Sequence, residues 1–500
     1  MEGLSSYERA LLTAGIIGLY FVMLLIVARF TTRKNDNATF FTANRESPWY
    51  LVAFGMIGTS ISGVTFISIP GEVGKVSFSY FQIVLGYFFG YLVIMYLLLP
   101  LYYRLNLISI YTYLQTRFGE SAYKTGSFFF LLSRTLGSAL RLFLAAMVFQ
   151  IFIFDQLKFP FELSVIISMA LILLYSIRGG IKTIVFTDTL QTLFLVGSLL
   201  LTIYFISDRL GWSLGETYTQ IKASPMSQMF FWDYKDNNFF WKQFLSGMFI
   251  TITMTGLDQD LMQKNLTCRN LKEAQKNMFT FSLIIIVANL LFLSLGALLY
   301  MFAAKNGLAI PERTDQLFPT IAFNYFPVGF AFIFLVGLTA ATFASTDSAL
   351  AALTTSFCID FLGFGKNGKE GKVSTRYWVH IGFGVLTVII ILIINARFNN
   401  KSVISNLFKV AGYTYGPLLG LFSFGLFSKR RLNDSLIPIL CILAPIVTYL
   451  IELGSAKIFP AYKFGFESIV INGLLVYISL YALSLYYNPN NKPGKHTTSH

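Results

Sequence analysis

Charged side chains are scarce in this chain of 500 residues. Asp, Glu, Lys and Arg together make up 12% of it, whereas 55% of the residues are hydrophobic and 17% are aromatic. Soluble domains usually carry about twice that share of charge, so an ordinary soluble enzyme is excluded. Apolar runs of about 18 or more residues recur along the sequence, and each is long enough to cross a bilayer. The composition therefore predicts a polytopic membrane protein.

Cysteine and histidine are also rare, with three of each. The cysteines are odd in number and stand far apart, so they indicate neither a disulfide framework nor a metal site. The histidines are scattered, and no Ser–His pair or metal cluster falls at membrane depth to activate a nucleophile. The segment Gly363–Glu370 resembles a phosphate-binding loop but lacks the required Ser or Thr after its last lysine. We therefore expect no enzyme, no cofactor and no use of ATP.

The apolar runs predict an all-α fold of about thirteen transmembrane helices. They lie near residues 10–29, 48–72, 78–102, 125–155, 160–177, 187–207, 242–263, 278–303, 321–361, 377–396, 403–427, 435–451 and 467–486. Together they form one membrane domain over residues 1–487, which is followed by a polar tail, residues 488–500. The composition of this tail is typical of disordered segments.

The basic residues between the runs indicate the orientation. With the N-terminus placed outside, most of the 38 Lys and Arg fall in cytoplasmic loops, including Lys264, Arg269 and Lys272. This asymmetry follows the positive-inside rule, so we expect an external N-terminus and a cytoplasmic C-terminus. The expected location is the plasma or inner membrane, where the bilayer is the partner and nucleic acid is not.

Two runs are interrupted by small and polar residues at mid-membrane depth. The segment Gly55–Gly63 breaks the second run, and Thr251–Gln259 breaks the seventh. Such breaks free backbone carbonyls, although small residues also allow helices simply to pack closely. The matched positions favour two equivalent halves, residues 48–207 and 242–427, with one helix before them and two after. Halves that each open with a discontinuous helix are typical of secondary transporters with a central site.

The ninth run carries a cluster of oxygen atoms within Ala340–Ser348. On a helix, Ser345 and Ser348 share one face, and the backbone of Ala341 lies one turn below. Asp347 adds a carboxylate, and ionisable groups at this depth usually mark function. Oxygen ligands without nitrogen or sulfur suit a hard cation such as sodium.

Two arginines lie inside the fourth run. A guanidinium keeps its proton, so each must find an anion, carbonyls or water. For Arg134 we favour snorkelling or pairing with a loop carboxylate. Arg141 lies deeper, and its planar fork matches a carboxylate, so we assign it to the substrate.

Two acidic residues each have two interpretations. Asp188, at the start of the sixth run, is either a helix N-cap or a second acidic group on the path by which sodium leaves. Asp258, in the second break, either lines the cavity or caps the helix that follows it.

Three segments resemble the signatures of the sodium/solute symporter family, and the resemblance extends over essentially the whole chain. They comprise Arg178-Gly179-Gly180 with Thr187, Asp188 and Gln191; Gly256-Leu257-Asp258-Gln259 with Gln263, Lys264 and Ala274; and Ala340–Ser348 followed by Asp360. The resemblance implies a LeuT-like inverted-repeat core and symport of a small organic solute, with the sodium ion as co-substrate.

The resemblance also implies sodium ligands between the second and ninth runs. In this chain they would be the carbonyls of Gly58, Ile61 and Ala341 and the hydroxyl of Ser345. The family has a second hydroxyl at position 344, where this chain has Ala344, so one oxygen is lost unless Thr59, Thr346 or water replaces it. A deeper sodium site would use Ser345, Asp347, Ser348 and Asp188.

For the substrate, the resemblance points toward the sialic-acid-transporting branch, because Arg141 is similar in placement to an arginine that meets the sugar acid's carboxylate. The amide and charged side chains of the sugar-transporting branch have no match here. The expected binding residues are Ser62, Thr65, Gln82, Arg141 and Asp258.

Three alternatives remain open. The first is a neutral sugar as substrate, and the second is coupling to protons, with Asp188 or Asp347 as the carrier. The third is a membrane sensor that has kept the transporter core, for which Ala344 is the only hint.

Overall fold

The computed structural model of the chain describes residues 6–32, 36–365, 371–397, 403–458, 464–465 and 467–486. Within these ranges the secondary structure is helical, and β structure is limited to one isolated bridge between Ser47 and Cys268. The predicted tail, residues 488–500, lies outside the described residues, as does the end of the loop that resembles a phosphate-binding segment.

The helices follow the chain order of the predicted runs. Up to residue 223 the chain forms α1 (Ser6–Thr31), α2 (Asn37–Thr42), α3 (Trp49–Ser60), α4 (Gly63–Val76), α5 (Tyr80–Val93), α6 (Leu99–Arg104), α7 (Thr112–Arg117), α8 (Glu120–Phe149), α9 (Phe161–Leu210) and α10 (Leu214–Ala223). From residue 240 onward it forms α11 (Phe240–Thr251), α12 (Gln259–Asn265), α13 (Leu271–Lys305), α14 (Leu317–Asn324), α15 (Val328–Ser356), α16 (Val373–Arg397), α17 (Val403–Phe427), α18 (Ile437–Ile458) and α19 (Ser468–Leu485). Single π-helical turns follow α5, α8, α11 and α15, at Ile94–Leu98, Gln150–Phe154, Ile252–Gly256 and Phe357–Phe361.

Ten helical stretches of the described residues are long and apolar enough to cross a membrane. The protein is therefore all-α and multi-pass. One stretch, α9, contains two of the predicted runs, which meet at a kink where Gly180 has φ 52°. A side chain at Gly180 would be strained at this φ and would overlap the ring of Phe40, so glycine allows α2 to pack into the kink.

Both predicted interruptions are confirmed. α3 ends at Ser60 and α4 begins at Gly63, while Ile61 (φ −84°, ψ 82°) and Ser62 (φ −73°, ψ 171°) between them are not helical. Serine and glycine are weak helix formers, which explains why the helix stops here. In the second half, α11 passes through the π turn at Ile252–Gly256 before α12 begins at Gln259.

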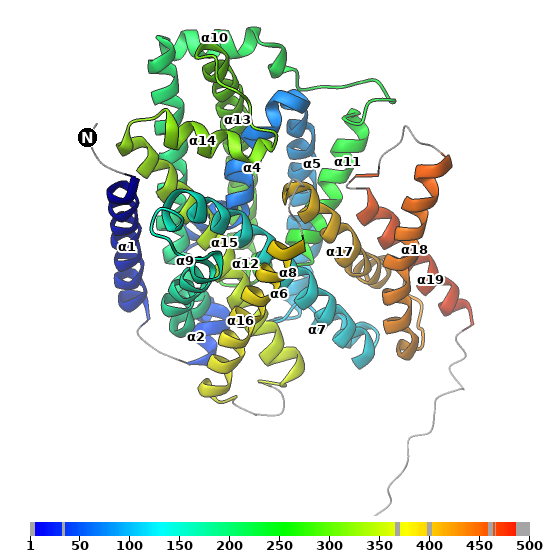
Figure 1. Ribbon diagram of the computed structural model, residues 1–500. Helices are drawn as coiled ribbons and strands as arrows, with labels where there is room; N and C mark the ends of the chain where they lie inside the picture. Colours follow the sequence, from blue (N-terminus) through cyan, green and yellow to red (C-terminus); the bar gives the residue numbers. More distant parts are fainter. Residues whose placement is uncertain are drawn as a thin grey trace, which may run out of the picture.

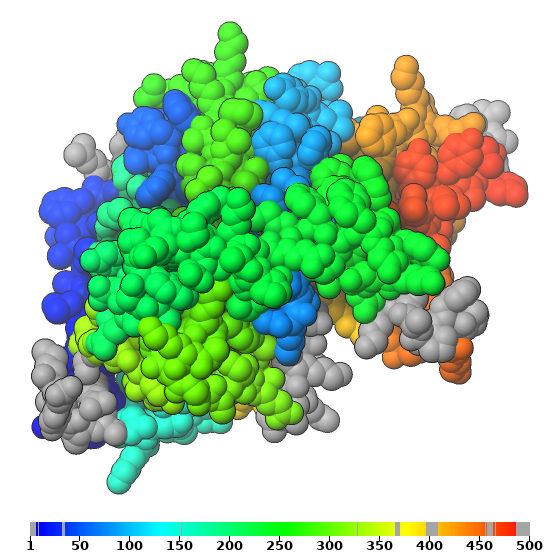
Figure 2. Space-filling view, turned by 90° about the horizontal axis from the view of Figure 1, so that it is seen from above, coloured from blue at the N-terminus to red at the C-terminus, as the bar shows by residue number. Residues whose placement is uncertain are grey.

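The broken helices lie inside the bundle. In Figure 1, α1 stands at the left edge and α18 and α19 at the right, with α8, α12 and α15 between them. α15 packs along α9, and α5 packs along α11. Figure 2, seen from above, shows the segments coloured green to lime, around α10, α11 and α14, spread over one end of the molecule. Both breaks therefore lie where side chains from several helices can meet.

Candidate functional site

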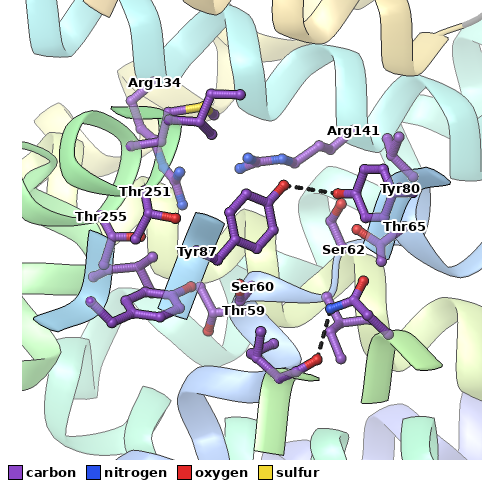
Figure 3. A pocket seen from close by; sticks show the side chains of 18 residues that line it. Thr59, Ser60, Ser62, Thr65, Tyr80, Tyr87, Arg134, Arg141, Thr251 and Thr255 are labelled. Atoms are coloured by element: carbon purple, nitrogen blue, oxygen red, sulfur yellow. Dashed lines mark hydrogen bonds between the residues drawn. The ribbon is translucent and has the colours of Figure 1, made fainter. Parts of the chain in front are cut away.

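A cavity of about 100 Å³ opens beside the first break. α3, α4 and α5 form one part of its wall, α8 and α11 form another, and α13 contributes two residues. Its lining is rich in hydroxyl groups and carries two arginines (Figure 3). The polar lining residues are Thr59, Ser60, Ser62, Thr65, Tyr80, Tyr87, Tyr91, Arg134, Arg141, Thr251, Thr255 and Asn289.

Arg141 is the charged side chain of this wall that has no acidic partner. Its guanidinium points into the cavity from α8 (Figure 3), its Nε has no hydrogen-bond partner among the described residues, and no described carboxylate lies within ion-pair distance. Tyr80 and Tyr87 on α5 face it, and their hydroxyl oxygens lie 2.9 Å apart. A half-buried cation that faces hydroxyls and lacks a counter-ion is arranged to receive an anion.

Three of the five predicted substrate residues, Ser62, Thr65 and Arg141, line this cavity. Gln82 does not. Its side-chain amide donates to the carbonyls of Ser79 (3.2 Å) and Asn238 (2.9 Å), and its Oε1 accepts from the amide of Phe231 (3.1 Å). The structure therefore places Gln82 as an anchor for the segment before α11.

Asp258 also lies apart from the cavity lining. Its Oδ1 accepts a hydrogen bond of 2.9 Å from the Asp260 amide at the start of α12, so the N-cap interpretation is confirmed. Its Oδ2 accepts from the hydroxyl of Tyr415 on α17 and lies 3.9 Å from Nη1 of Arg134. These contacts tie the second break to α8 and α17.

Arg134 neither snorkels nor pairs with a loop carboxylate. Its side chain is 3% exposed, and its Nη2 pairs with Oδ2 of Asp260, a fully buried residue of α12. The expectation for Arg134 was wrong because the compensating charge comes from the broken seventh run. Arg134 thus has a fixed counter-ion, whereas Arg141, two turns further along the same helix, has none in the part of the chain that the structure describes.

The predicted sodium ligands lie where the end of α3 meets α15. The hydroxyl of Thr59 is 3.4 Å from the carbonyl oxygen of Ala344, and a side chain added at Gly58 would come within 2.6 Å of Thr192 Oγ1 and 3.5 Å of Ala344 Cβ. Gly58, Ile61, Ala341 and Ser345 are all buried at this junction. Helix ends leave backbone carbonyls without intrahelical partners, so the end of α3 offers oxygens toward α15.

Three hydroxyls of α15, those of Ser345, Thr346 and Ser348, are already hydrogen-bonded. Ser345 Oγ and Thr346 Oγ1 each donate to the carbonyl of Thr342 at 2.9 Å, within the helix. Ser348 donates to Oδ1 of Asp260. A hydroxyl oxygen keeps its lone pairs when it donates its proton, so the hydrogen bond to the helix does not prevent Ser345 from binding a cation.

Asp188 lies inside α9, so it is not a helix N-cap. Its Oδ2 accepts from the hydroxyl of Thr59 at 2.9 Å and from the ammonium of Lys264. The hydroxyl of Tyr175 donates to Oδ2 of Asp347 at 2.7 Å. Lys264 had been expected in a cytoplasmic loop, but it is the sixth residue of α12 and only 1% exposed.

The ligand types fit sodium better than a transition metal. Among the described residues, no group of three or more His, Cys, Asp and Glu side chains is placed to hold a metal ion. The oxygens at the α3–α15 junction are carbonyls, hydroxyls and carboxylates, which are the ligands of hard cations.

Residues 40–435 match the model of the sodium:solute symporter family. The chain belongs to the sodium:solute symporter family. It is thus a membrane transporter and not an enzyme. The sodium/sialic acid symporters of Proteus mirabilis (strain HI4320) and Aliivibrio fischeri (strain ATCC 700601 / ES114) are each 24% identical to this symporter over 432 residues. The match covers 83% of this chain and 84% of the first relative, and 84% of this chain and 83% of the second.

A solved structure of a sodium-coupled sialic acid symporter, in a substrate-bound outward-open state, has the same fold. It superposes with a TM-score of 0.81 at 20% sequence identity, over 95% of this symporter and 98% of that chain. The symporter therefore has a LeuT-like fold, as the resemblance in sequence implied.

Sequence reasoning missed several groups of the site. Tyr80, Tyr87 and Tyr91 line the cavity, and their spacing of seven and four residues places them on one face of a helix, which was a usable signal. For Asp260 the sequence offered a weaker indication, namely its position close to Asp258 in the motif. Nothing in the sequence indicated that Lys264 is buried, because it follows the last apolar residues of a broken run.

Proposed function

We propose that this symporter carries a carboxylated sugar, of the sialic acid class, into the cell together with sodium. The observation that carries the proposal is Arg141, which has no acidic partner within the described ranges and lies in the wall of a cavity lined by hydroxyls. A guanidinium binds a carboxylate through two parallel hydrogen bonds. The relatives in Proteus and Aliivibrio, which are named sodium/sialic acid symporters, support the same class of substrate.

The start of α4 supplies a second group for the carboxylate. α4 begins at Gly63, and its N-cap, Ser62, makes no side-chain hydrogen bond to the helix. The first amides of a helix lack intrahelical partners and carry partial positive charge, so they attract anions. Ser62 and Thr65 line the same cavity as Arg141. In our proposal the carboxylate lies between Arg141 and this helix end, and the sugar hydroxyls face Tyr80, Tyr87 and Asn289.

The proposed sodium site lies at the α3–α15 junction. Its ligands are the carbonyls of Gly58, Ile61 and Ala341 and the hydroxyl of Ser345. We propose Thr59 as the substitute for the oxygen lost at Ala344, because its hydroxyl lies 3.4 Å from the Ala344 carbonyl oxygen. Ser345→Ala is expected to weaken sodium dependence, and unchanged dependence would place the cation elsewhere.

A second, deeper sodium site is proposed around Asp188 and Asp347, with Ser345 and Ser348 at its edge. Both carboxylates are fully buried. Oδ1 of Asp188 has no hydrogen-bond partner among the described residues, which leaves it open to a cation.

The proposed architecture is thirteen spans in two inverted repeats, residues 48–207 and 242–427, with the N-terminus outside and the C-terminus in the cytoplasm. The two breaks, one at the start of each repeat, support it. Sodium would steady α3 against α15 and complete the cavity, so that the loaded form binds substrate better, which is what coupling requires. Rocking of one repeat against the other would then release both solutes inside.

Uptake of matched ligands into proteoliposomes tests the substrate class. We expect accumulation of radiolabelled sialic acid to be blocked by an excess of unlabelled sialic acid and not by an excess of its methyl ester, which keeps the hydroxyls and loses the charge. Equal competition by the ester, or by neutral hexoses, would contradict a role for the carboxylate and favour the neutral-sugar alternative.

A further inference from the structure

The ammonium of Lys264 already occupies part of the proposed deep sodium site. Lys264 extends from α12, and its Nζ donates to Oδ2 of Asp188 on α9 and to Oγ1 of Thr59 on α3. The side chains of Lys264 and Asp188 are 1% and 0% exposed. The lysine therefore joins the half-helix after the second break to the half-helix before the first.

The charges around this lysine do not balance. Asp188 and Asp347 are both fully buried and interact electrostatically, and Lys264 is the cation nearest to both. Among the described residues, no other basic side chain forms an ion pair with either carboxylate. With both carboxylates ionised, one ammonium leaves a net charge of minus one in a buried space, so the site still attracts a cation such as sodium while Lys264 is in place.

A sodium ion and the ammonium of Lys264 would bind the same oxygen atoms at this site. Each carries one positive charge, and each would be held by the carboxylate of Asp188 and a neighbouring oxygen. A lysine side chain can move away from such a site readily, because its compact charge is carried on a flexible stem of four carbons. Since the ammonium is tethered to the chain, it competes with sodium at every sodium concentration.

We propose that Lys264 is a built-in competitor of sodium, which neutralises Asp188 in the sodium-free protein and is displaced when sodium binds the deep site. This inference rests on the proposed sodium site. Displacement breaks the contacts of Lys264 with Asp188 and Thr59, so sodium binding releases α12 from α9 and α3. The lysine thereby lowers the apparent sodium affinity and links sodium binding to the position of the second broken helix.

The variant Lys264→Gln tests the proposal, with thermal unfolding in detergent as the measurement and choline chloride replacing sodium chloride at constant ionic strength. Without sodium the variant is expected to melt below wild type, because Asp188 loses its counter-ion. Sodium is expected to raise its Tm more than that of wild type. The half-saturating sodium concentration is expected to fall about tenfold, within the usual range for coupled sites.

Two controls separate competition from a general loss of a buried ion pair. Lys242→Gln removes a lysine that pairs with Glu467 at 3.2 Å, away from the site, and is expected to respond to sodium as wild type does. Lys264→Arg retains a tethered cation, so its half-saturating sodium concentration is expected not to fall. If Lys264→Gln does not fold, Lys264→Met, which keeps an unbranched stem and loses the charge, takes its place, and its half-saturating sodium concentration is expected to fall in the same way.

The outcomes distinguish this inference from the proposed function. If wild type responds to sodium but Lys264→Gln has an unchanged or higher half-saturating concentration, the lysine is not a competitor and the sodium site stands. A tenfold fall in the half-saturating sodium concentration of Lys264→Arg would equally overturn the inference. It would show that the positive charge at position 264 does not compete with sodium. If neither wild type nor Lys264→Gln responds to sodium, the proposed sodium site fails and the inference fails with it.

Discussion

Arg134 and Asp260 form an ion pair between α8 and α12, with the two side chains 3% and 0% exposed. The same carboxylate accepts a hydrogen bond from Ser348 on α15. Asp260 therefore connects the second broken helix to two neighbouring helices at once. A buried pair of this kind contributes little net stability, but the loss of one partner leaves the other charge uncompensated.

Replacement of Asp260 by Asn is expected to destabilise the symporter by about 3 kcal/mol or more, because the guanidinium of Arg134 stays buried without its counter-ion. Chemical unfolding in detergent, with Asp233→Asn in an exposed loop as the control, measures the effect. A loss no larger than that of the control would show that Arg134 finds other partners.

Arg141 is expected to be needed for substrate and not for folding. Arg141→Gln is expected to reduce kcat/KM for the carboxylated sugar by roughly thirty-fold or more, which corresponds to about 2 kcal/mol or more of lost binding. Arg141→Lys is expected to be intermediate, since it keeps the charge and loses the planar fork. Initial uptake rates give the values, and Arg209→Gln, at the exposed end of α9, serves as the control. Full activity of Arg141→Gln would remove this residue from the site.

Gln82 is expected to act through structure. Gln82→Leu leaves the amide of Phe231 and the carbonyl of Asn238 without their present partner, so a loss of about 2 kcal/mol in stability is expected. KM is expected to stay near the wild-type value. A raised KM in a protein of unchanged stability would return Gln82 to the substrate site.

Cys268 is expected to be unreactive in the folded protein. Burial, with a smaller contribution from the nearby charge of Glu273, raises the pKa of this thiol to about 12. Because the thiolate is the reactive form, its fraction at pH 8 is on the order of one in ten thousand, and the side chain is fully buried. In a Cys358→Ala/Cys441→Ala background, maleimide labelling at pH 8 is expected only after denaturation. Rapid labelling of the native protein would show that the loop before α13 opens.

The parts of the fold that follow from local sequence were predictable. Apolar runs, and the weak helix formers around Ile61 and Gly256, locate the helices and both breaks, because hydrophobicity and helix propensity act over neighbouring residues. The sequence predicted two separate runs, residues 160–177 and 187–207, where the structure has one helix, α9, with a kink at Gly180. The two runs could not be joined from sequence, although the helix resumes directly after the kink.

Site residues were predictable only where their position depends on a single helix. The position of Arg141 in the cavity wall could be predicted because it lies deep in a single run. Gln82 was misplaced because it stands two residues after Tyr80, about 200° around the helix, and so points away from the cavity. The pairs Arg134–Asp260 and Lys264–Asp188 depend on how α12 packs against α8 and α9, which no local pattern contains.

Sodium-driven accumulation in proteoliposomes tests the central claim most directly. With an inward sodium gradient and no pH gradient, wild-type protein is expected to concentrate labelled sialic acid above its external level, and equal sodium on both sides is expected to abolish the concentration. Accumulation that ignores sodium and follows an imposed pH gradient would contradict the account.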